Sequence, residues 1–487
     1  MATRIPKNHA RFTVAELLAA TRGELCVPGS AEGATSISTD TRGLDPGAAF
    51  VALHGKAYDG HAYVEAAAAA GAAVAIVEHG VEAPPTLTVI RVASTLLALG
   101  DLARAHVQRW RASGDRTLVG ITGSAGKTTT RVATAALVES LTPGQLVATR
   151  GNLNNRIGVP LMLFVLAPEH RCCIVELGTS EPGEIPELCR IAQPDVGIVT
   201  LVTAAHLDGF GSVDNVEHEK AALYRSLPIE GTAVGNGDDW RVRRSLQTTR
   251  AVRRVTFGRS AEARVRVLGR EPLGMNRSRV TLVHAGGQRS ALETPLVGEA
   301  GALACAAAVA TVEAAFDVRF DGDWLANALA RVDTRDGAQR LIPHELPSGL
   351  VVIDDSYNAN PASMVSSIWT AEEMARAANR PLVLVLGEMR ELASEAAQGH
   401  EAVGRVAAES GARIVFAIGG GEAFRIGRSA QEGGADVFFA STVDQGLPAV
   451  IDAVRTTDLA LVKGSRSVGM DRIVAELSRC HGPRTPP

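Results

Sequence analysis

Aromatic residues are scarce in this sequence, and neither sign of charge predominates. Phe, Trp and Tyr make up 4% of the 487 residues, and the formal net charge is −4. Proteins that bind nucleic acids usually carry clusters of Lys and Arg with aromatic side chains among them, and no such cluster occurs along this sequence. The composition therefore argues against a nucleic-acid partner. The abundant Ala and Gly predict helices that pack closely on sheets.

The sequence also lacks the cysteine spacing of a disulfide scaffold and the long apolar runs of a membrane protein. Its six cysteines, none of them in a CxxC pair, are Cys26, Cys172, Cys173, Cys189, Cys305 and Cys480. We expect them to be reduced, as in cytoplasmic proteins. The first residues, MATRIPKNHARFTVAELL, contain no apolar signal segment, and apolar runs such as 66–77 are too short to span a bilayer. We therefore expect a cytoplasmic protein without a membrane segment.

The most informative stretch runs from Leu118 to Thr130, LVGITGSAGKTTT. An apolar strand, a glycine-rich turn and a helix follow one another, so that backbone N–H groups and the positive end of the helix dipole meet where phosphate oxygens bind. Lys127 would add a positive charge there, and Thr128 a hydroxyl ligand for Mg²⁺. The sequence therefore predicts a nucleotide site made by Gly123, Ser124, Ala125, Gly126, Lys127, Thr128 and Thr129.

The glycine spacing of this loop differs from the usual P-loop. That pattern has glycine five residues before the Gly of Gly-Lys, where this chain has Ile121. The loop is thus a shorter variant, Gly123-x-x-Gly126-Lys127-Thr128. The alternative is an ordinary strand-to-helix turn whose glycines serve only the backbone geometry.

Two later strands carry polar side chains toward the same predicted sheet edge. Glu176 follows the apolar run Cys172–Val175, and His206 comes shortly after the run 196–202. Because the carboxyl ends of parallel strands meet at one edge, we expect both side chains beside the glycine loop. A carboxylate there is the usual second anchor for nucleotide-bound Mg²⁺, and His206 is a candidate for a further ligand or a positioning group. Alone, Glu176 equally suits a helix cap, and His206 a backbone hydrogen bond.

Strand and helix patterns divide the chain into three α/β units. We predict a small unit over residues 1–113, a central unit with a parallel sheet and an antiparallel extension over 114–332, and a doubly wound, Rossmann-like unit over 333–487. In the first unit, polar residues concentrate at 38–42 and 54–61, where ligand binding and solvated loops are equally compatible with the sequence. The third unit has DDSYNANP, Asp354 to Pro361, instead of a Gly-x-Gly-x-x-Gly turn, which favours a polar ligand over a dinucleotide.

Several motifs together resemble the Mur ligase superfamily. They are STDTRGLDPGAAFVAL and DGHAYVEAAAAAGA in the first unit, ITGSAGKTTT, GNLNNRIGVP, ELGTSEPGEI and HLDGFGS in the second, and DDSYNANPASM, LGEMREL and KGSR in the third. The matching stretches extend over nearly the whole chain, and those of the third unit are the most specific, being typical of members that add a dipeptide. The resemblance implies a domain for a UDP-sugar, a central ATPase domain, and a C-terminal domain that closes over ATP and binds the dipeptide.

The resemblance also implies a reaction. The enzyme would join D-alanyl-D-alanine to UDP-N-acetylmuramoyl-tripeptide in bacterial peptidoglycan precursor synthesis, with ATP and a pair of Mg²⁺ ions. ATP would phosphorylate the terminal carboxylate of the tripeptide, and the dipeptide amine would displace the phosphate through a tetrahedral intermediate. Because a carboxylate is a poor electrophile, this reaction requires neutralised charge and an aligned donor and acceptor. We expect a monomer.

The matching motifs imply roles for individual residues. Lys127 would hold the β- and γ-phosphates, Thr128 and Glu176 the first Mg²⁺, and His206 the second. Lys220, in EHEKA, matches a position where many Mur ligases carry a carbamylated lysine that bridges metals, although from the sequence alone it is a solvated helix lysine. The other implied residues are Asn152, Asn154 and Asn155 near the reacting centre, Arg340 at the ATP phosphates, Asp355 at the ribose, and Ser38, Thr39, Lys56, Asn358 and Asn360 at the substrates.

The chain departs from the family pattern at the adenine end of the nucleotide. Mur ligases usually carry Gly-x-His-Asn-x-x-Asn at the start of the Ala-rich helix expected over 299–315, where this chain has GEAGALA from Gly298. Losing a few hydrogen bonds of about 1 kcal/mol each would weaken ATP binding without removing the reaction. Two alternatives stay open: a catalytically silent relative that acts as a binding scaffold, and a Mur-type ligase with a different amino-acid substrate.

Overall fold

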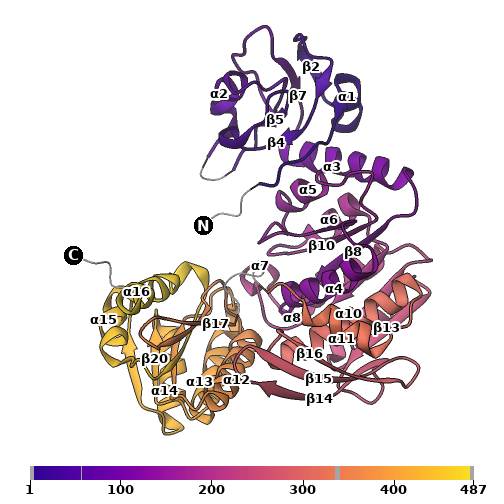
Figure 1. Cartoon of the computed structure of the whole chain (residues 1–487). Helices are drawn as coiled ribbons and strands as arrows, with labels where there is room; N and C mark the ends of the chain where they lie inside the picture. Colours follow the sequence, from indigo (N-terminus) through magenta and orange to yellow (C-terminus); the bar gives the residue numbers. More distant parts are fainter. Residues whose placement is uncertain (1–4, 56–57, 335–340, 483–487) are drawn as a thin grey trace.

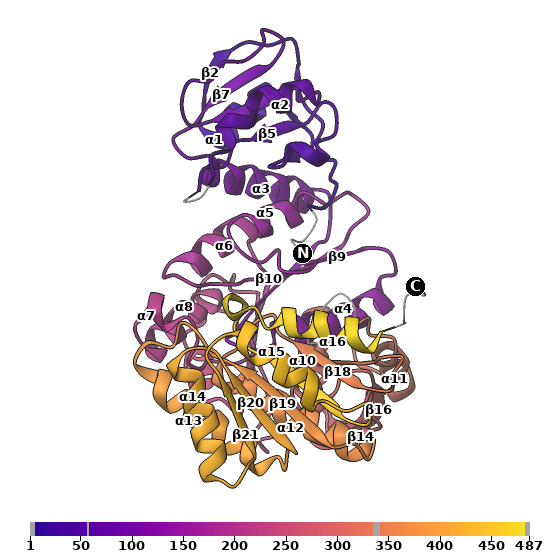
Figure 2. The ribbon, with the colours of Figure 1, turned by 90° about the vertical axis from the view of Figure 1, so that its left-hand side faces the viewer.

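The computed structural model describes residues 5–55, 58–334 and 341–482, which form three larger sheets in chain order (Figure 1). In both views the unit built on the first sheet lies at the top and the unit built on the last sheet at the bottom (Figures 1 and 2). The α/β architecture predicted from the sequence is confirmed.

The first sheet has five strands in the order β2-β7-β6-β5-β4. Strands β4 to β7 are parallel, and β2 is antiparallel to β7. Alternate residues of β5 and β6 belong to separate apolar cores, so both faces of the sheet are covered. The bounds are β2 Glu24–Val27, β4 Ile37–Ser38, β5 Ala49–Val51, β6 Val74–Val77 and β7 Thr88–Arg91, with α1 Val14–Thr21, α2 Val64–Ala69 and the small antiparallel pair β1 Phe12–Thr13 and β3 Gly33–Ala34.

Helix α3, Thr95–Ala112, connects the first and central units. It packs on α1 and also on α5 and α6, so one apolar core continues from the first sheet into the central unit. The helix ends at Ala112, one residue before the predicted end of the first unit at residue 113.

The central sheet has nine strands in the order β16-β15-β14-β13-β12-β11-β8-β10-β9. Strands β8 to β14 run parallel, whereas β14, β15 and β16 pair antiparallel. The predicted antiparallel extension is confirmed, although neither β9 nor β16 was expected. The bounds are β8 Thr117–Thr122, β9 Leu146–Ala148, β10 Cys172–Glu176, β11 Val196–Val199, β12 Thr232–Asn236, β13 Arg253–Gly258, β14 Val265–Leu273, β15 Arg277–Val283 and β16 Arg289–Thr294.

Helices cover both faces of the central sheet. On one face lie α4 Lys127–Leu141, α10 Gly298–Phe316 and α11 Gly322–Ala330; on the other lie α5 Gly158–Leu163, α6 Glu184–Ala192 and α8 Val213–Arg225. The short helices α7 Leu207–Phe210 and α9 Trp240–Leu246 flank α8. This arrangement leaves the carboxyl ends of β8, β10 and β11 together at one edge.

Helix α10 is long and apolar enough, by length and composition, to cross a membrane. It packs against α4 and strands β12, β13 and β14, and 61% of its apolar window is buried there. Its interior position accounts for its apolar sequence.

The third sheet has six strands in the order β17-β18-β22-β19-β20-β21, all parallel except β17. Apolar cores on its two faces make it doubly wound, as predicted. The bounds are β17 Ile342–Glu345, β18 Val351–Asp355, β19 Leu382–Gly387, β20 Ile414–Ile418, β21 Val437–Ala440 and β22 Leu459–Lys463, with α12 Pro361–Ala377, α13 Ala396–Glu409, α14 Gly421–Glu432, α15 Val443–Ala453 and α16 Asp471–His481.

The third unit contacts the central unit along α12. This helix packs against α10 and β14, and Glu373 of α12 pairs with Arg270 of β14. The contact brings the start of α12 next to the glycine loop of the central unit.

Candidate functional site

The glycine loop lies between β8, near the middle of the central sheet, and α4. Its backbone has φ values of +153° at Gly123 and +83° at Gly126, which side-chain-bearing residues rarely adopt. A Cβ atom on Gly123 would lie 1.9 Å from Thr200 Oγ1. Glycine is therefore required in this turn, and the backbone of α4 begins at Lys127 with its N–H groups pointing out of the sheet edge.

Strand β11 braces the loop from its other side. The Ser124 N–H donates to Leu201 O (2.8 Å), the Ser124 hydroxyl donates to Thr203 O (3.0 Å), and the Thr200 hydroxyl donates to Ala125 O (2.6 Å). Lys127 Nζ folds over the loop and donates to Gly123 O at 2.7 Å. The loop is thus held in shape by the protein itself, which suits it to anion binding.

Glu176 ends β10 beside the first turn of α4. Its Oε2 accepts a hydrogen bond from Thr128 Oγ1 at 3.1 Å, and its Oε1 pairs with Arg131 Nε at 2.9 Å. Glu176 and Arg131 are each 1% exposed. The predicted proximity of Glu176 to Thr128 is thus present in the structure. Arg131 was not predicted, although an arginine one turn after Thr128 in an otherwise apolar stretch was a usable signal.

His206 lies at the start of α7, in the left-handed backbone conformation with φ +55°. Its Nδ1 contacts the Glu391 carboxylate, and Leu207 N donates to Glu391 O at 2.7 Å. Burial lowers the pKa of His206 despite the raising effect of Glu391, and the charges of Lys127 and Lys220 lower it further. Glu391 belongs to the LGEMREL motif, but the sequence gave no sign that its partner would be His206.

Lys220 on α8 is buried, with 3% exposure. The interpretation of Lys220 as a solvated helix lysine is therefore wrong: α8 turns this position inward against the central sheet. Burial, together with the charge of Lys127, holds the pKa of Lys220 well below its ordinary value, although Glu219 opposes this. The Glu219 carboxylate is already bound by the N–H groups of Gly183 (2.9 Å) and Ile185 (2.7 Å).

The asparagine loop lies against the turn that follows β10. Asn154 O accepts a hydrogen bond from Gly178 N at 2.7 Å, which places this loop two residues beyond Glu176. Asn155 Oδ1 accepts from Ile157 N (3.1 Å) and Gly158 N (2.8 Å) at the start of α5. Asn152 and Asn155 are exposed, and Asn155 in addition supports the helix start.

The third unit reaches the loop through Asn360. This residue caps α12 through Ser363 N (2.9 Å), and its Nδ2 donates to Ser124 O at 3.2 Å. Asp355 is buried, and its Oδ2 pairs with Lys463 Nζ (2.7 Å) of the KGSR motif. Lys463 also donates to Asn358 O at 2.9 Å, so the two most specific motifs of this unit hold each other.

A cavity of about 240 Å³ adjoins the first turn of α4. Its walls include Thr128 and Thr129 of α4, residues just before and within the start of α10, and residues at the start of β17, namely Leu296, Val297, Ala300, Gly301, Leu341, Ile342 and Pro343. Asn276, in the turn between β14 and β15, supplies an amide to this mostly apolar lining. Glu299 is paired with Arg259 (2.5 Å). Asn276 was not predicted, because a turn asparagine is ordinary in any hairpin.

The remaining predicted residues are distant or outside the description. Ser38 ends β4 in the first unit, where its hydroxyl donates to Asp40 O at 3.0 Å, and Thr39 follows it. Lys56 and Arg340 lie outside the described residues. The structure therefore gathers Lys127, Thr128, Glu176, His206 and Lys220 at one place, with Asn360 beside them.

Comparisons with known proteins agree with this geometry. The Mur ligase middle domain matches residues 121–312, the "Mur ligase, glutamate ligase domain" residues 339–466, and the "Mur ligase family, catalytic domain" residues 34–107. The UDP-N-acetylmuramoyl-tripeptide--D-alanyl-D-alanine ligase of Escherichia coli is 34% identical over 447 residues, which cover 91% of this chain and 93% of that protein.

Solved structures show the same likeness. MurF from Acinetobacter baumannii has a TM-score of 0.84 and 30% identity over 96% of this chain and 99% of that one. MurF ligase from Thermotoga maritima, solved in complex with ADP, has a TM-score of 0.76 and 24% identity over 91% of this chain and 97% of that one.

Proposed function

The chain belongs to the Mur ligase family, and we infer that it is an ATP-dependent ligase that joins D-alanyl-D-alanine to UDP-N-acetylmuramoyl-tripeptide in peptidoglycan precursor synthesis. The observation that carries this is the gathering of Lys127, Thr128, Glu176, His206 and Lys220 at the carboxyl edge of the central sheet. The assigned domains are 1–113 for the UDP-sugar, 114–332 for ATP, and 333–487 for closure and dipeptide binding.

ATP is placed with its phosphates on the glycine loop. Residues between Gly123 and Thr129 present backbone N–H groups to the phosphates. The Lys127 ammonium would exchange its hydrogen bond to Gly123 O for one to the phosphate oxygens. The base then falls in the 240 Å³ cavity, with Asn276 in reach of its polar edge. Asn276 would thereby replace the asparagines missing from the start of α10. Arg340 and Asp355 are kept as proposed contacts of the phosphates and the ribose.

The side chains around the loop suit Mg²⁺. Mg²⁺ prefers oxygen ligands, and the side-chain oxygens Thr128 Oγ1 and Glu176 Oε2 lie 3.1 Å apart. Both residues are buried. His206 keeps Nε2 available while Nδ1 contacts Glu391, and its lowered pKa favours the neutral, ligating form. Bound Mg²⁺ would neutralise charge on the transferring phosphate.

Lys220 is proposed to be carbamylated. A lysine whose pKa is well below its ordinary value loses its proton more readily, and the lone pair of the resulting neutral amine can attack CO₂ with loss of one proton. The product is an anion in a position next to Lys127 and His206, where the unmodified ammonium is disfavoured by charge and by burial. The carbamate would serve, with His206, as the second metal site.

The chain's residues would then perform two tasks. Lys127 and the loop N–H groups align the γ-phosphate with the tripeptide carboxylate, which takes it to form an acyl phosphate and release ADP. The dipeptide amine attacks the acyl carbon, and phosphate leaves as the amide forms. Asn152 and Asn155 are the proposed neighbours of the reacting carboxylate. The contacts of Asn360 and Glu391 with the central unit hold the third domain over this site.

The proposed substrate contacts lie in the outer units. Ser38, Thr39 and Lys56 would contact the UDP-sugar in the first, and Asn358 and Asn360 the dipeptide in the third. We also propose that the enzyme is a cytoplasmic monomer.

The test is phosphate release from ATP by the purified chain. Release should require both UDP-N-acetylmuramoyl-tripeptide and D-alanyl-D-alanine, and Lys127→Met should abolish it. Release that proceeds with a single amino acid in place of the dipeptide would point to another Mur-type substrate. A folded protein without any release under these conditions would contradict the proposal.

A further inference from the structure

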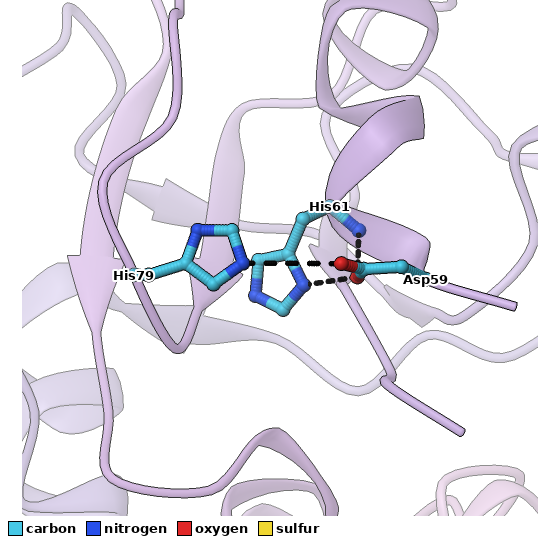
Figure 3. Close-up of side chains that lie close together, drawn as sticks. All are labelled: Asp59, His61 and His79. Carbon is cyan, nitrogen blue, oxygen red and sulfur yellow. Dashed lines mark hydrogen bonds and ion pairs between the residues drawn. The ribbon is translucent and has the colours of Figure 1, made fainter. Parts of the chain in front are cut away.

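A second cluster of ligand-type side chains lies in the first unit, away from the ligase site (Figure 3). Asp59 lies in the loop after β5, His61 in the short 3-10 helix that follows it, and His79 in the loop after β6. Because β5 and β6 are parallel neighbours, their following loops meet at one sheet edge.

His61 is already satisfied by the protein. Its Nδ1 lies 2.5 Å from Asp59 Oδ1, and its Nε2 accepts a hydrogen bond from Glu78 N at 2.8 Å. An Nε2 that accepts must be unprotonated, so in the neutral ring the proton is on Nδ1 and is donated to Asp59. With 3% of its side chain exposed, His61 is a buried support that orients the Asp59 carboxylate and not a ligand itself.

The outer oxygen of Asp59 is the one left for a ligand. Oδ1 accepts from both the backbone N–H and the ring of His61, whereas within the described part of the chain Oδ2 accepts no hydrogen bond. Donation from the backbone N–H of His61 and then from its ring lowers the pKa of Asp59 to about 2. The carboxylate is therefore an anion throughout the neutral range.

His79 faces this free oxygen with its Nε2. Its Nδ1 lies 3.2 Å from Gly80 O, a carbonyl that can only accept, so in the neutral ring Nδ1 carries the proton and Nε2 carries a lone pair. Nε2 lies 3.9 Å from Asp59 Oδ2, and the His79 ring stacks on His61 with centroids 4.1 Å apart (Figure 3). Two lone pairs that face each other without a proton between them leave room for a cation.

We propose that Asp59 and His79, with His61 orienting the carboxylate, form a binding site for a divalent transition-metal ion of the zinc class. Imidazole nitrogen with carboxylate oxygen is a donor set that suits Zn²⁺, Co²⁺ and Ni²⁺ rather than Mg²⁺ or Ca²⁺. Two ligands on a tetrahedral ion at about 2.1 Å are about 3.4 Å apart, so the exposed His79 ring needs to move by roughly half an ångström.

The negative charge of the site argues against an anion as its ligand. A phosphate or carboxylate ligand would meet the ionised Asp59 at the centre of the cluster and be repelled. A bound metal would join the two loops. This inference is independent of the ligase reaction, because it concerns binding by the free enzyme.

The experiment measures metal binding to the full-length, tag-free chain with saturating Mg²⁺ present. Zn²⁺ affinity is determined by competition with a chromophoric chelator, and Co²⁺ binding by visible absorption. The key variant is His79→Gln. The His79 side chain is 61% exposed, and its loss leaves the Asp59–His61 pair intact. The matched control is His9→Gln, an exposed histidine of the same unit outside the cluster.

The wild-type chain and His9→Gln should bind one Zn²⁺ more than His79→Gln. Co²⁺ should give d–d absorption that His79→Gln abolishes. Equal Zn²⁺ binding by wild type and His79→Gln would overturn the proposal, and so would the absence of binding in both, since the contact would then be only an imidazole–carboxylate pair.

Discussion

Replacing Arg131 by Met tests both the stability of the ATP site and the role of Glu176. The Arg131–Glu176 pair is buried, with Nε and Oε1 2.9 Å apart, and Thr128 donates to the other carboxylate oxygen. Removing one partner of a buried pair costs about 3–5 kcal/mol because the other charge is left uncompensated. For a domain of this size each kcal/mol shifts Tm by about 2–4 °C, so the melting transition of the central unit should fall by roughly 6–20 °C.

Bound Mg²⁺-ATP should change the Tm of the Arg131 and Glu176 variants in opposite directions relative to wild type. If Glu176 holds Mg²⁺, Mg²⁺-ATP supplies a positive charge to the carboxylate that Arg131→Met leaves unpaired, and this variant should gain more Tm from Mg²⁺-ATP than wild type does. Glu176→Gln removes the carboxylate that would hold the cation, so it should gain less than wild type. The double variant Arg131→Met/Glu176→Leu should recover much of the stability but none of the ligation.

Differential scanning fluorimetry with and without Mg²⁺-ATP, together with phosphate release, measures these effects. Arg250→Met, at an exposed position of the central unit, is the control and should change Tm by less than about 1 °C. Identical Mg²⁺-ATP shifts in wild type, Arg131→Met and Glu176→Gln would refute Glu176 as a metal ligand. A drop below about 2 °C for Arg131→Met would refute the energetic argument for the pair.

Three further outcomes are expected. Asn276→Ala should lose about 1 kcal/mol of ATP binding, so steady-state kinetics should show KM for ATP raised about fivefold and kcat unchanged. An equal fall in kcat would argue against a contact with the base. Gly123→Ala should lower kcat/KM by about 100-fold or more, since its Cβ would lie 1.9 Å from Thr200 Oγ1, and near-normal activity would contradict the geometry. Burial lowers the pKa of His400 in the folded protein, so as the pH falls His400 binds a proton in the unfolded state before it does so in the folded state. The free energy of unfolding should therefore be level above about pH 6.5 and fall below it. Urea unfolding at several pH values should show a smaller fall for His400→Gln, and an unchanged fall would exclude His400 as its source.

The sequence predicted elements best where one physical signal dominated. The continuous apolar runs of β10, β11 and β19 have the composition of strands buried on both faces, and all are strands in the structure. Strand β17 was missed because its residues Ile342–Glu345 include a proline and two exposed polar side chains, and only pairing with β18 makes them a strand.

The part of the site at the carboxyl edge of the central sheet was predictable from the sequence, whereas the burial of Lys220 and the contact with the third unit were not. Lys127 and Thr128 follow from the local geometry of a strand, a glycine turn and a helix, and the structure has that geometry. Lys220 could not be placed, because the burial of a helix position depends on which face meets the sheet. Glu391 and His206 lie 185 residues apart, and only the docking of the third unit brings them together.

At the proposed adenine end of the site, we infer that a departure from the family motif is compensated. The missing asparagines at the start of α10 leave small residues, Ala300 and Gly301, which line a cavity instead of offering amides to a base. An amide is restored from a different element, since the β14–β15 turn brings Asn276 to the same cavity. The edge of a base needs hydrogen-bond donors and acceptors at the right positions, whichever element supplies them. The position of the β14–β15 hairpin therefore decides whether the pocket remains selective for its base. The phosphate end has no such freedom, because the positive φ of Gly123 and the brace from Thr200 fix one backbone course.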